Sequence, residues 1–458
     1  MNPRVFREYD IRGQAERDLD SGFVEDLGRA IGTHLRRAGA RRITLGRDCR
    51  TSSPRLHGAL RKGLLSTGIQ LIDVGVVATP VLYYSVFHFD ADGGVQITGS
   101  HNPPEDNGFK VLRGKSTIHG AEIQALRALI DKRDFETGLG TVQSADIEEA
   151  YIEMAAKRIK LGPRRFKVVV DAGNGVGGVC VPLLRKLGFD VTALYCEPDG
   201  RFPNHHPDPT IEKNVADLKA KVAEVGAEVG IALDGDADRL GVVDAKGRIV
   251  WGDQLMILFA RAILKEQPGA TFVSEVKASK SLYDEIAKAG GKAIMWKVGH
   301  SLIKEKMKEE KAVLAGEMSG HIFFAHRYFG YDDAIYSAAR LIELLSNDKT
   351  TLAEHVDTLP KMHNTPELRH ELPDEIKFEV VKRMVERFQK KDHGIVEVID
   401  VDGARVVWKD GWALVRASNT QPALVLRFEA ESEARLAELR AFVEGELKKI
   451  ESQVQVAK

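Results

Sequence analysis

"VGIALDGDADR", residues 229–239, is an uninterrupted apolar run that ends abruptly in glycine and acidic residues. Such a run is typical of a strand buried on both faces of an α/β sheet, because a half-exposed strand would alternate apolar and polar residues. The same form recurs at 41–48, 68–79, 166–175, 191–197 and 312–321, and helical periodicities lie between these runs at 22–39 and 336–347. The sequence therefore predicts several similar α/β units in series, without a strict sequence repeat.

The pattern changes after about residue 365. The stretch "GIVEVIDVDGARVVWKDGWALVRAS" (394–418) predicts antiparallel strands joined by Asp-Gly turns. A helix should follow over 433–450, because its apolar residues share one face that can pack on this sheet: Leu436, Leu439, Val443, Leu447 and Ile450. Strands followed by a helix predict a separate, smaller C-terminal α+β domain.

Composition limits the classes of protein that remain. The chain has 458 residues, a formal net charge of −1 and three cysteines, none in CxxC spacing. This length predicts three or four domains, and the near-zero charge gives no general attraction to nucleic acid or to an anionic membrane. Few cysteines, a charged N-terminus and the lack of a long apolar stretch together predict a cytoplasmic protein without a structural zinc cluster.

Three aspartates follow the strand expected at 229–233. Asp234, Asp236 and Asp238 lie at alternate positions of a glycine-containing loop, where their carboxylates can converge on one cation. Ligation by oxygen alone predicts a hard cation, Mg²⁺ first. An EF-hand is excluded because Arg239 and Ala245 stand where that motif needs glycine and glutamate. A solvated acidic turn remains the bland alternative.

A glycine pattern points to a different chemistry. Gly173, Gly175 and Gly178 form G-x-G-x-x-G directly after an expected strand, and Glu197 ends the next one. That arrangement is typical of a dinucleotide site, so an NAD-dependent dehydrogenase is an alternative at this point. The competing interpretation is that these glycines only permit a tight turn and close packing.

Ser100 lies in "GGVQITGSHNPPEDNGFK" (93–110), after a short apolar run. Two consecutive prolines, Pro103 and Pro104, prevent a helix here and predict a rigid loop over 98–107. In open α/β sheets ligands gather at the carboxyl ends of the strands, where this loop would lie. By itself, however, the stretch also fits a surface turn.

Two further stretches carry groups suited to a phosphorylated sugar. "LVRASNTQP" (414–422) offers a guanidinium, hydroxyls and an amide that suit a phosphate, although an ordinary turn fits this composition equally well. "AGEMSGH" (315–321) places Glu317, Ser319 and His321 beside small residues, which lets a sugar hydroxyl approach closely.

Together with "FREYDIRG" (6–13), these motifs resemble in kind and order the α-D-phosphohexomutases, specifically the bacterial phosphomannomutase/phosphoglucomutase branch. The resemblance spans essentially the whole chain. It implies an α/β fold of three similar mixed-sheet domains and a smaller C-terminal α+β domain around a central active-site cleft. We expect the phosphoserine loop in 1–147, the metal-binding loop in 148–250, the sugar-recognition loop in 251–364 and the phosphate-binding loop in 365–458.

The resemblance also implies roles for individual residues. Ser100 would be the phosphoserine and would complete the Mg²⁺ site of Asp234, Asp236 and Asp238. The remaining catalytic positions would be His101, Lys110, Arg239, Lys277 and His300, with proton transfer or substrate orientation assigned to the last two. The substrate-binding positions would be Tyr9, Arg12, Glu317, Ser319, His321, Arg416, Ser418, Asn419 and Thr420. Ala237 departs from the family, in which many members have glycine, and should stiffen the metal loop slightly.

The implied activity is the interconversion of hexose 1-phosphate and hexose 6-phosphate, with glucose, mannose or both as the sugar. The implied cofactor is Mg²⁺. The implied activator, which is also the reaction intermediate, is glucose 1,6-bisphosphate or mannose 1,6-bisphosphate. A phosphoglucosamine or phosphopentose mutase is the near alternative, and a Mg²⁺-dependent phosphosugar phosphatase or an inactive sugar-phosphate sensor is more distant. We expect a monomer or a dimer with a phosphosugar as its partner, and no nucleic acid or membrane.

Overall fold

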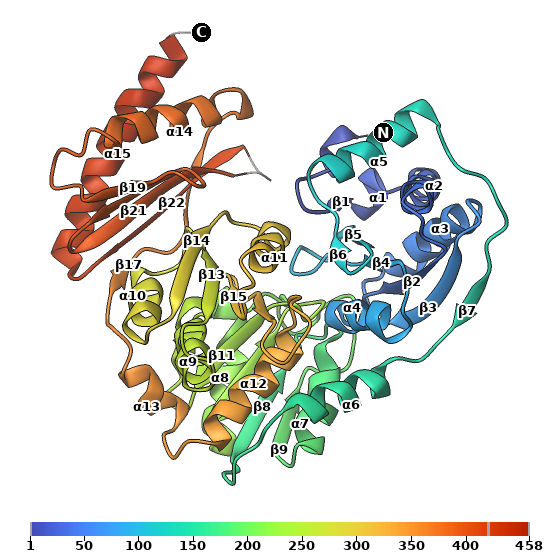
Figure 1. The fold of residues 1–458 in the computed structure, drawn as a ribbon, viewed down its shortest axis with the longest axis horizontal. Helices are drawn as coiled ribbons and strands as arrows, with labels where there is room; N and C mark the ends of the chain where they lie inside the picture. The colour runs from blue at the N-terminus through green and yellow to red at the C-terminus, as the bar shows by residue number, and fades with distance from the viewer. Residues whose placement is uncertain (1, 419–421, 457–458) are drawn as a thin grey trace. The chain divides into compact units, whose positions relative to one another are not determined.

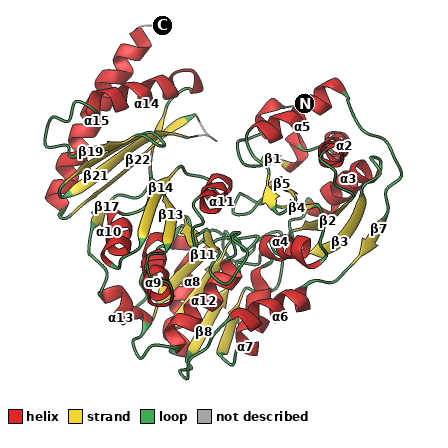
Figure 2. Cartoon of the chain, in the orientation of Figure 1, coloured by secondary structure: helices red, strands yellow, loops and turns green. Residues whose placement is uncertain are grey.

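Residues 2–418 and 422–456 are described by the structure, a computed structural model. Its contacts divide the chain into two compact units, Met1–Ala262 with Ser319–Asp357 and Ile263–Met318 with Thr358–Lys458. Helices and strands alternate through most of the chain (Figures 1 and 2). Among the described residues, no helix combines the length and the apolar character needed to span a bilayer.

The first sheet of the first unit carries the Ser100 loop. Its strands follow the order β1-β5-β4-β2-β3-β7, with β6 beside β5. They are β1 (Ile11–Gln14), β2 (Arg42–Arg47), β3 (Gln70–Val76), β4 (Gly93–Ile97), β5 (Asp106–Arg113), β6 (Ser116–Thr117) and β7 (Val142–Ser144). Because β2 and β4 are parallel, both end at one edge of the sheet, and β5 returns antiparallel to β4. The loop after β4 is shorter than the expected 98–107, because Asp106 and Asn107 already pair with β1.

Helices of this first sheet pack around it and complete its core. They are α1 (Ala15–Asp18), α2 (Ser21–Arg37), α3 (Ser53–Leu65), α4 (Thr79–His88) and α5 (Ala121–Lys132), and the short 3₁₀ helix η1 (Pro3–Val5) precedes them. The apolar stripe of α2, which includes Leu27, Ile31 and Leu35, is fully buried in this core. This burial stabilises the helix, since most helical stability in proteins comes from packing of one apolar face.

The second sheet of the first unit carries the three aspartates. Its order is β12-β11-β10-β8-β9, with strands β8 (Lys167–Asp171), β9 (Asp190–Leu194), β10 (Val229–Leu233), β11 (Leu240–Asp244) and β12 (Ile249–Val250). The strands β8, β9 and β10 are parallel, but β11 pairs antiparallel with β10, and Leu233 lies opposite Leu240. Residues 234–239 are therefore the tight connection of a β-hairpin, and the hairpin fixes both of its ends.

Helices and shorter elements complete this part of the first unit. The helix α12, predicted over 336–347, spans Ala334–Ser346 and packs against β10 and β11. Its start at residue 334 is set by Asp333, whose side chain caps the backbone N–H of Tyr336 at 2.7 Å. The other elements are α6 (Glu148–Arg158), η2 (Gly177–Val179), α7 (Cys180–Lys186), η3 (Glu212–Val215), α8 (Ala216–Val225), β16 (Ile322–Phe324) and α13 (Leu352–Asp357).

The second unit contains a parallel sheet and the C-terminal α+β sheet. The chain enters it within α9 (Gly252–Glu266), and β13 (Thr271–Glu275) then runs parallel to both β14 (Lys292–Trp296) and β15 (Leu314–Gly316). Helices α10 (Lys280–Lys288) and α11 (His300–Glu309) connect these strands. Ser274 near the end of β13 donates to the carbonyl of Gly316 at 2.7 Å, which ties together the loops that follow β13 and β15.

The C-terminal sheet has the order β17-β22-β21-β20-β19, with β18 beside β22. Its strands are β17 (His363–Asn364), β18 (Leu368–Glu371), β19 (Glu397–Ile399), β20 (Ala404–Trp408), β21 (Gly411–Ala417) and β22 (Ala423–Ala430). Helices α14 (Asp374–Phe388) and α15 (Glu433–Val456) share one apolar core with this sheet (Figure 1). The predicted α/β fold class with a C-terminal α+β domain is thus confirmed, whereas the boundaries between the domains stay a prediction.

All three cysteines lie in the first unit as free thiols. Burial raises the pKa of Cys49 to about 12 and that of Cys196 to about 11, and it also raises the pKa of the fully buried Cys180. None of these side chains is therefore a thiolate at neutral pH.

Candidate active site

Ser100 lies in the loop that follows β4 and is almost completely buried, with 2% of its surface exposed. Its hydroxyl donates to Oδ2 of Asp234 at 2.7 Å and lies 3.1 Å from Nδ1 of His101. The backbone at Ser100 has a φ of +49°, in the left-handed region that residues with a side chain seldom adopt. The surrounding structure therefore has to hold this residue in place.

The aspartate loop brings its three carboxylates together. Asp234, Asp236 and Asp238 are fully buried, and their candidate ligand oxygens lie within 4.8 Å of one another. The second oxygen of Asp234 accepts hydrogen bonds from the backbone N–H groups of Asp238 at 3.0 Å and Arg239 at 3.1 Å. The loop's own backbone thus fixes the first carboxylate within the hairpin.

The chemistry of this group fits a divalent cation. Burial and the charges of Asp236 and Asp238 raise the pKa of Asp234 well above its usual range, so the group lacks positive charge. One oxygen of Asp236, Oδ1, is buried and has no hydrogen-bond partner among the described residues. Carboxylate oxygens from three residues suit Mg²⁺, which keeps further coordination positions for other oxygen ligands.

Lys110 on β5 supplies part of the missing charge. Its Nζ lies 2.7 Å from Oδ2 of Asp236 and also contacts Oδ2 of Asp238. Burial works to lower the pKa of Lys110, but the charges of these two carboxylates outweigh it and raise the pKa well above its usual value. Lys110 is therefore a permanent ammonium group beside the metal loop.

His101 and Arg239 complete the polar surroundings of Ser100. Burial and the charges of Arg239 and Arg12 lower the pKa of His101 well below its usual value, so its imidazole is neutral at pH 7. Nε of Arg239 donates to Nε2 of His321 at 2.9 Å, and Nδ1 of the same ring lies 3.2 Å from Asp332. The arginine contact makes Nε2 of His321 the hydrogen-bond acceptor, while Nδ1 faces the carboxylate of Asp332.

The N-terminal motif reaches the same loop. Arg12 on β1 donates to the side-chain oxygen of Asn102 at 2.7 Å and forms an ion pair with Asp10 at 2.6 Å. Tyr9 lies half-buried in the turn before β1, and Ser319 lies half-buried in the turn before His321. The first unit therefore contains most of the predicted residues, and Arg12 contacts the Ser100 loop directly.

The second unit holds the remaining predicted residues. Lys277, after β13, lies 3.2 Å from Glu367 and 3.6 Å from Glu275. Burial alone would lower the pKa of Lys277, but these two carboxylates and Glu317 outweigh it and raise the pKa. An ammonium with a raised pKa orients a substrate better than it accepts a proton, which favours the orienting role for Lys277.

Glu317 and His300 lie next to each other in the second unit. The carboxylate of Glu317 accepts the backbone N–H of Gly299 at 2.7 Å, and His300 is the first residue of α11. Two residues earlier in the chain, the N–H of Val298 donates to Asp402 at 3.0 Å, and this carboxylate also accepts Nε of Arg416 at 3.1 Å. Asp402 thus connects the His300 segment to the predicted phosphate-binding strand β21.

The phosphate-binding loop is described only in part. Arg416 and Ser418 are buried, and the carbonyl of Ser418 accepts Nζ of Lys377 at 2.6 Å. Asn419 and Thr420 lie outside the residues that the structure describes.

Several residues of these sites did not stand out in the sequence. Thr79, which begins α4, donates to Oδ2 of Asp236 at 2.5 Å. His206, in the proline-rich loop 202–209, has its Nε2 2.5 Å from the carbonyl of His101. Asp48 and Arg50 follow β2, which is parallel to β4. Residues that follow two neighbouring parallel strands lie at the same edge of the sheet, and this position was the one feature of the sequence that could have placed them near the Ser100 loop.

The glycines of the G-x-G-x-x-G pattern pack against this same site. A Cβ on Gly175 would lie 2.5 Å from the carbonyl oxygen of Gly235, and a Cβ on Gly235 would lie 2.4 Å from that of Ser100. Three backbone segments therefore touch directly. The expected ribose-binding Glu197 is exposed, and its backbone carbonyl accepts the side chain of Asn174. These glycines permit close packing, as the alternative interpretation of the motif required.

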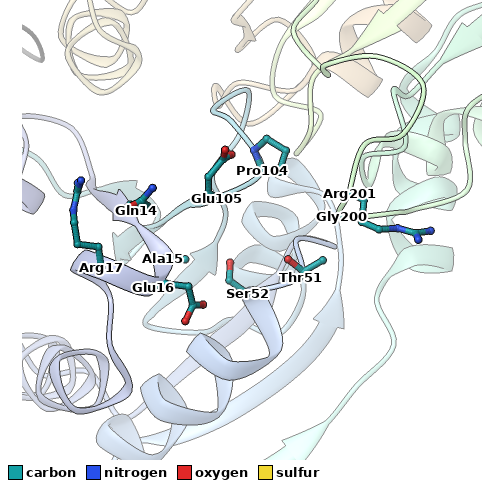
Figure 3. A pocket seen from close by; sticks show the side chains of 10 residues that line it. All are labelled: Gln14, Ala15, Glu16, Arg17, Thr51, Ser52, Pro104, Glu105, Gly200 and Arg201. Carbon is teal, nitrogen blue, oxygen red and sulfur yellow. The ribbon is translucent and has the colours of Figure 1, made fainter.

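A pocket of about 730 Å³ lies beside the Ser100 loop rather than at the aspartates (Figure 3). One wall comes from Pro104 and Glu105 of that loop, and another comes from Thr51 and Ser52 at the start of α3. The other lining residues are Gln14, Ala15, Glu16, Arg17, Gly200 and Arg201.

Comparison with known proteins covers nearly the whole chain. Four domain models of phosphoglucomutase/phosphomannomutase match residues 3–137, 149–247 and 251–363, the alpha/beta/alpha domains I, II and III, and 367–446, the C-terminal domain. The phosphomannomutase/phosphoglucomutase of Pseudomonas aeruginosa is 45% identical over 454 residues, which cover 99% of this chain and 97% of the relative. The phosphoglucomutase of Neisseria gonorrhoeae is 44% identical over 440 residues, 95% of each chain.

A solved structure agrees with these matches. The crystal structure of a phosphoglucomutase/phosphomannomutase family protein from Burkholderia thailandensis has a TM-score of 0.93, 41% sequence identity and 98% coverage of both chains. Fold and matches together define an isomerase of the phosphohexomutase class. The chain belongs to the phosphoglucomutase/phosphomannomutase family. The NAD-dependent dehydrogenase alternative is thereby set aside.

Proposed function

We propose that this phosphohexomutase acts on glucose and mannose phosphates and carries the transferred phosphoryl group on Ser100. The observation that supports this assignment most directly is the 2.7 Å hydrogen bond from the Ser100 hydroxyl to Asp234, one of three buried carboxylates. A serine phosphate at this position would place its oxygens next to the candidate cation site. Mg²⁺ held by Asp234, Asp236 and Asp238 would supply charge stabilisation for a transferring phosphoryl group.

Each turnover then contains two transfers. In the first, the bond from phosphorus to Ser100 Oγ breaks as a bond forms to the free hydroxyl oxygen of the hexose phosphate, giving a hexose 1,6-bisphosphate. In the second, the other phosphoryl group of this intermediate returns to Ser100, and the isomeric monophosphate leaves. In the first step the hexose hydroxyl loses a proton and the serine oxygen gains one, and in the second step the serine hydroxyl loses a proton and the sugar oxygen gains one. His101, with Nδ1 3.1 Å from Oγ, is placed to exchange that proton.

The other residues bind and orient the substrate in this proposal. Lys110 and Arg239 bring permanent positive charge to the phosphoryl group, which carries negative charge throughout the transfer. Glu317, Ser319 and His321 bind sugar hydroxyls, while Lys277 and His300 orient the sugar. Arg416 and Ser418, with Asn419 and Thr420, bind the phosphate that does not react. Tyr9 and Arg12 complete the binding residues near the Ser100 loop.

The finer features of the function remain part of the proposal. A phosphoglucosamine mutase is the near alternative, because no residue that we identify reads the substituent at carbon 2 of the sugar. We propose the cytoplasm as the location, since three free thiols suit a reducing compartment. We expect a monomer or a dimer, and glucose 1,6-bisphosphate or mannose 1,6-bisphosphate should activate the enzyme by loading Ser100.

Intact-mass spectrometry tests the central assignment. The purified protein should include a fraction that carries one phosphoryl group, and incubation with glucose 1,6-bisphosphate should increase that fraction. Ser100→Ala should abolish it, whereas Ser66→Ala should not, because Ser66 donates to the carbonyl of Gly63 within α3. A phosphoryl group that persists in Ser100→Ala would refute the assignment.

Activity assays then separate the alternatives. A coupled assay should show conversion of glucose 1-phosphate and mannose 1-phosphate to their 6-phosphates at higher kcat/KM than glucosamine 1-phosphate. Release of inorganic phosphate as the main product would instead support a phosphatase.

A further inference from the structure

Arg50, three residues beyond the end of β2, packs against the Ser100 loop. Its side chain is completely buried. One terminal nitrogen, Nη2, donates to the carbonyl oxygens of Ser100 at 2.7 Å and Asn102 at 2.6 Å. The other, Nη1, donates to those of Pro103 at 2.5 Å and Asp106 at 2.9 Å. A single guanidinium therefore binds three carbonyls of the Ser100 loop and that of Asp106, the first residue of β5.

The guanidinium is itself held in place from several sides. Its Nε lies 3.3 Å from Oδ2 of Asp48, and that carboxylate also accepts the backbone N–H of Gly99 at 3.2 Å. The ring of Phe202 lies 5.2 Å from the guanidinium carbon, within the range of a cation–π contact. A Cβ on Gly99 would lie 2.5 Å from that carbon, so only glycine lets the loop approach so closely.

The prolines leave this part of the loop with few backbone donors of its own. Pro103 and Pro104 have no N–H groups, so only Asn102 in the Asn102–Pro103–Pro104 stretch donates from its backbone, to the carbonyl of Gly99 at 2.9 Å, and the carbonyls of the stretch provide its other backbone hydrogen bonds. A carbonyl that points to Arg50 also fixes its peptide plane, because the peptide bond is planar and none among the described residues is cis. The plane that joins Ser100 to His101 is fixed in this way. Its N–H points away from the guanidinium, since N–H and C=O are antiparallel in a trans peptide.

We infer that Arg50 is a positioning residue for phosphoryl transfer, which holds Ser100 in its left-handed conformation through the carbonyls of its loop. The inference rests on the proposed role of Ser100 as the phosphoryl carrier. Arg50 touches neither the hydroxyl of Ser100 nor the aspartates in any described hydrogen bond, so its effect passes through the backbone. Lysine cannot replace it, because an ammonium offers three donors from one point and cannot reach four carbonyls in a plane.

The chain offers a matched control in Arg55. This residue lies five positions later, on α3, and its guanidinium also binds backbone carbonyls, those of Leu19 and Ala15, both at 2.9 Å. It makes no contact with the Ser100 loop in the described structure. Arg55 is more exposed than Arg50, with 32% of its side chain accessible, so its loss removes hydrogen bonds from an arginine to backbone carbonyls at a lower structural cost and leaves the hydrogen bonds of Ser100 in place.

The test compares Arg50→Lys with Arg55→Lys, both assayed well below their unfolding temperatures. Misplacing a reacting group by about 1 Å can cost about 100-fold in rate, so Arg50→Lys should lower kcat by that order while KM for glucose 1-phosphate changes little. The rate at which glucose 1,6-bisphosphate phosphorylates Ser100, followed by intact mass, should fall in parallel. Arg55→Lys should keep both rates near the wild-type values.

Three further variants cover the case in which Arg50→Lys does not fold. Gly99→Ala keeps Arg50 but pushes the loop off its guanidinium, and it should lower kcat in the same way. Added guanidinium ion should restore part of the phosphorylation rate of Arg50→Ala and have no such effect on Arg55→Ala. Equal phosphorylation rates and kcat in Arg50→Lys and Arg55→Lys would overturn the inference. If the wild-type protein itself never carries a phosphoryl group, the proposed role of Ser100 fails instead.

Discussion

Ser100 and Asp234, 134 residues apart in the sequence, are joined by a hydrogen bond of 2.7 Å from the serine hydroxyl to the carboxylate. Ser100 lies in a loop that follows a strand of the first sheet, and Asp234 lies in the hairpin connection between two paired strands of the second sheet. The neighbouring strands therefore fix the ends of both loops. The contact therefore joins two rigid pieces at the position where phosphoryl transfer is proposed. A small change in either loop should affect catalysis more than stability.

Asp236→Asn should lower kcat by on the order of 100-fold, because a charged ligand of the proposed cation is lost. The same variant should lose the stabilisation by Mg²⁺ that binding to the native state provides. Calorimetry measures this directly: Mg²⁺ should raise the Tm of the wild-type protein and leave that of Asp236→Asn unchanged. Asp357→Asn removes the same charge from an exposed ion pair with Lys246 and Arg248, and it should respond to Mg²⁺ as the wild type does. An equal response in Asp236→Asn would contradict the proposed ligand set.

Gly175→Ala should destabilise the first unit by about 1–3 kcal/mol and lower kcat, because the new methyl group would press on the carbonyl of Gly235 in the metal loop. Thermal unfolding and the coupled assay measure the two effects. Gly58→Ala is the control, since a Cβ on Gly58 of α3 would meet no atom within 4 Å. If both variants behave alike, the packing role of Gly175 is wrong.

Arg416→Ala should raise KM for hexose phosphates by about 10- to 100-fold, the loss expected for a charge-assisted hydrogen bond to phosphate. The Tm should change much less, because the ion pair of Arg416 among the described residues is with one side chain, Asp402, which is partly exposed. Initial-rate kinetics give the result. Arg383→Ala, which breaks an exposed pair with Glu379 on α14, should leave KM unchanged. An unaltered KM in Arg416→Ala would remove this residue from the phosphate site.

Glu275→Gln should flatten the dependence of stability on pH. Burial raises the pKa of Glu275 to about 7 in the folded protein, above its ordinary value of about 4.3. Between these two values the folded state holds a proton that the unfolded state has released. This group therefore makes the free energy of unfolding fall as pH rises from about 4.3 to about 7, and the effect is constant at higher pH.

Calorimetry at steps from pH 5 to pH 8 checks this prediction. The difference in Tm between Glu275→Gln and the wild type should grow in favour of the variant across that range, because the glutamine cannot ionise. The variant can keep the acceptor for the backbone N–H of Met318. Parallel curves for the two proteins would show that the carboxyl group of Glu275 titrates normally.

Much of the fold could be predicted from local sequence. The continuous apolar runs at 41–48 and 229–233 became the buried strands β2 and β10. Both Asp-Gly pairs, at 402–403 and 410–411, form the predicted connections of β20 to its neighbours. These features depend on periodicity and turn chemistry, which act over a few residues.

Strand direction and long-range contacts were harder to predict. An apolar run such as β11 is equally compatible with parallel and antiparallel pairing, so the hairpin that closes the aspartate loop was not expected. The motif residues around Ser100 were expected through the family resemblance. Arg50 and Thr79 were not, because a buried arginine or threonine looks like any other in the sequence, and its partners lie far along the chain.

The reactivity of the three cysteines can be used to measure how often the first unit opens. Their raised pKa values and limited exposure mean that a maleimide or disulfide reagent should label the folded enzyme slowly at neutral pH. Once the unit opens, each thiol regains an ordinary reactivity and is trapped. Pulse labelling, read by mass, would then follow local opening of the first unit without any engineered probe.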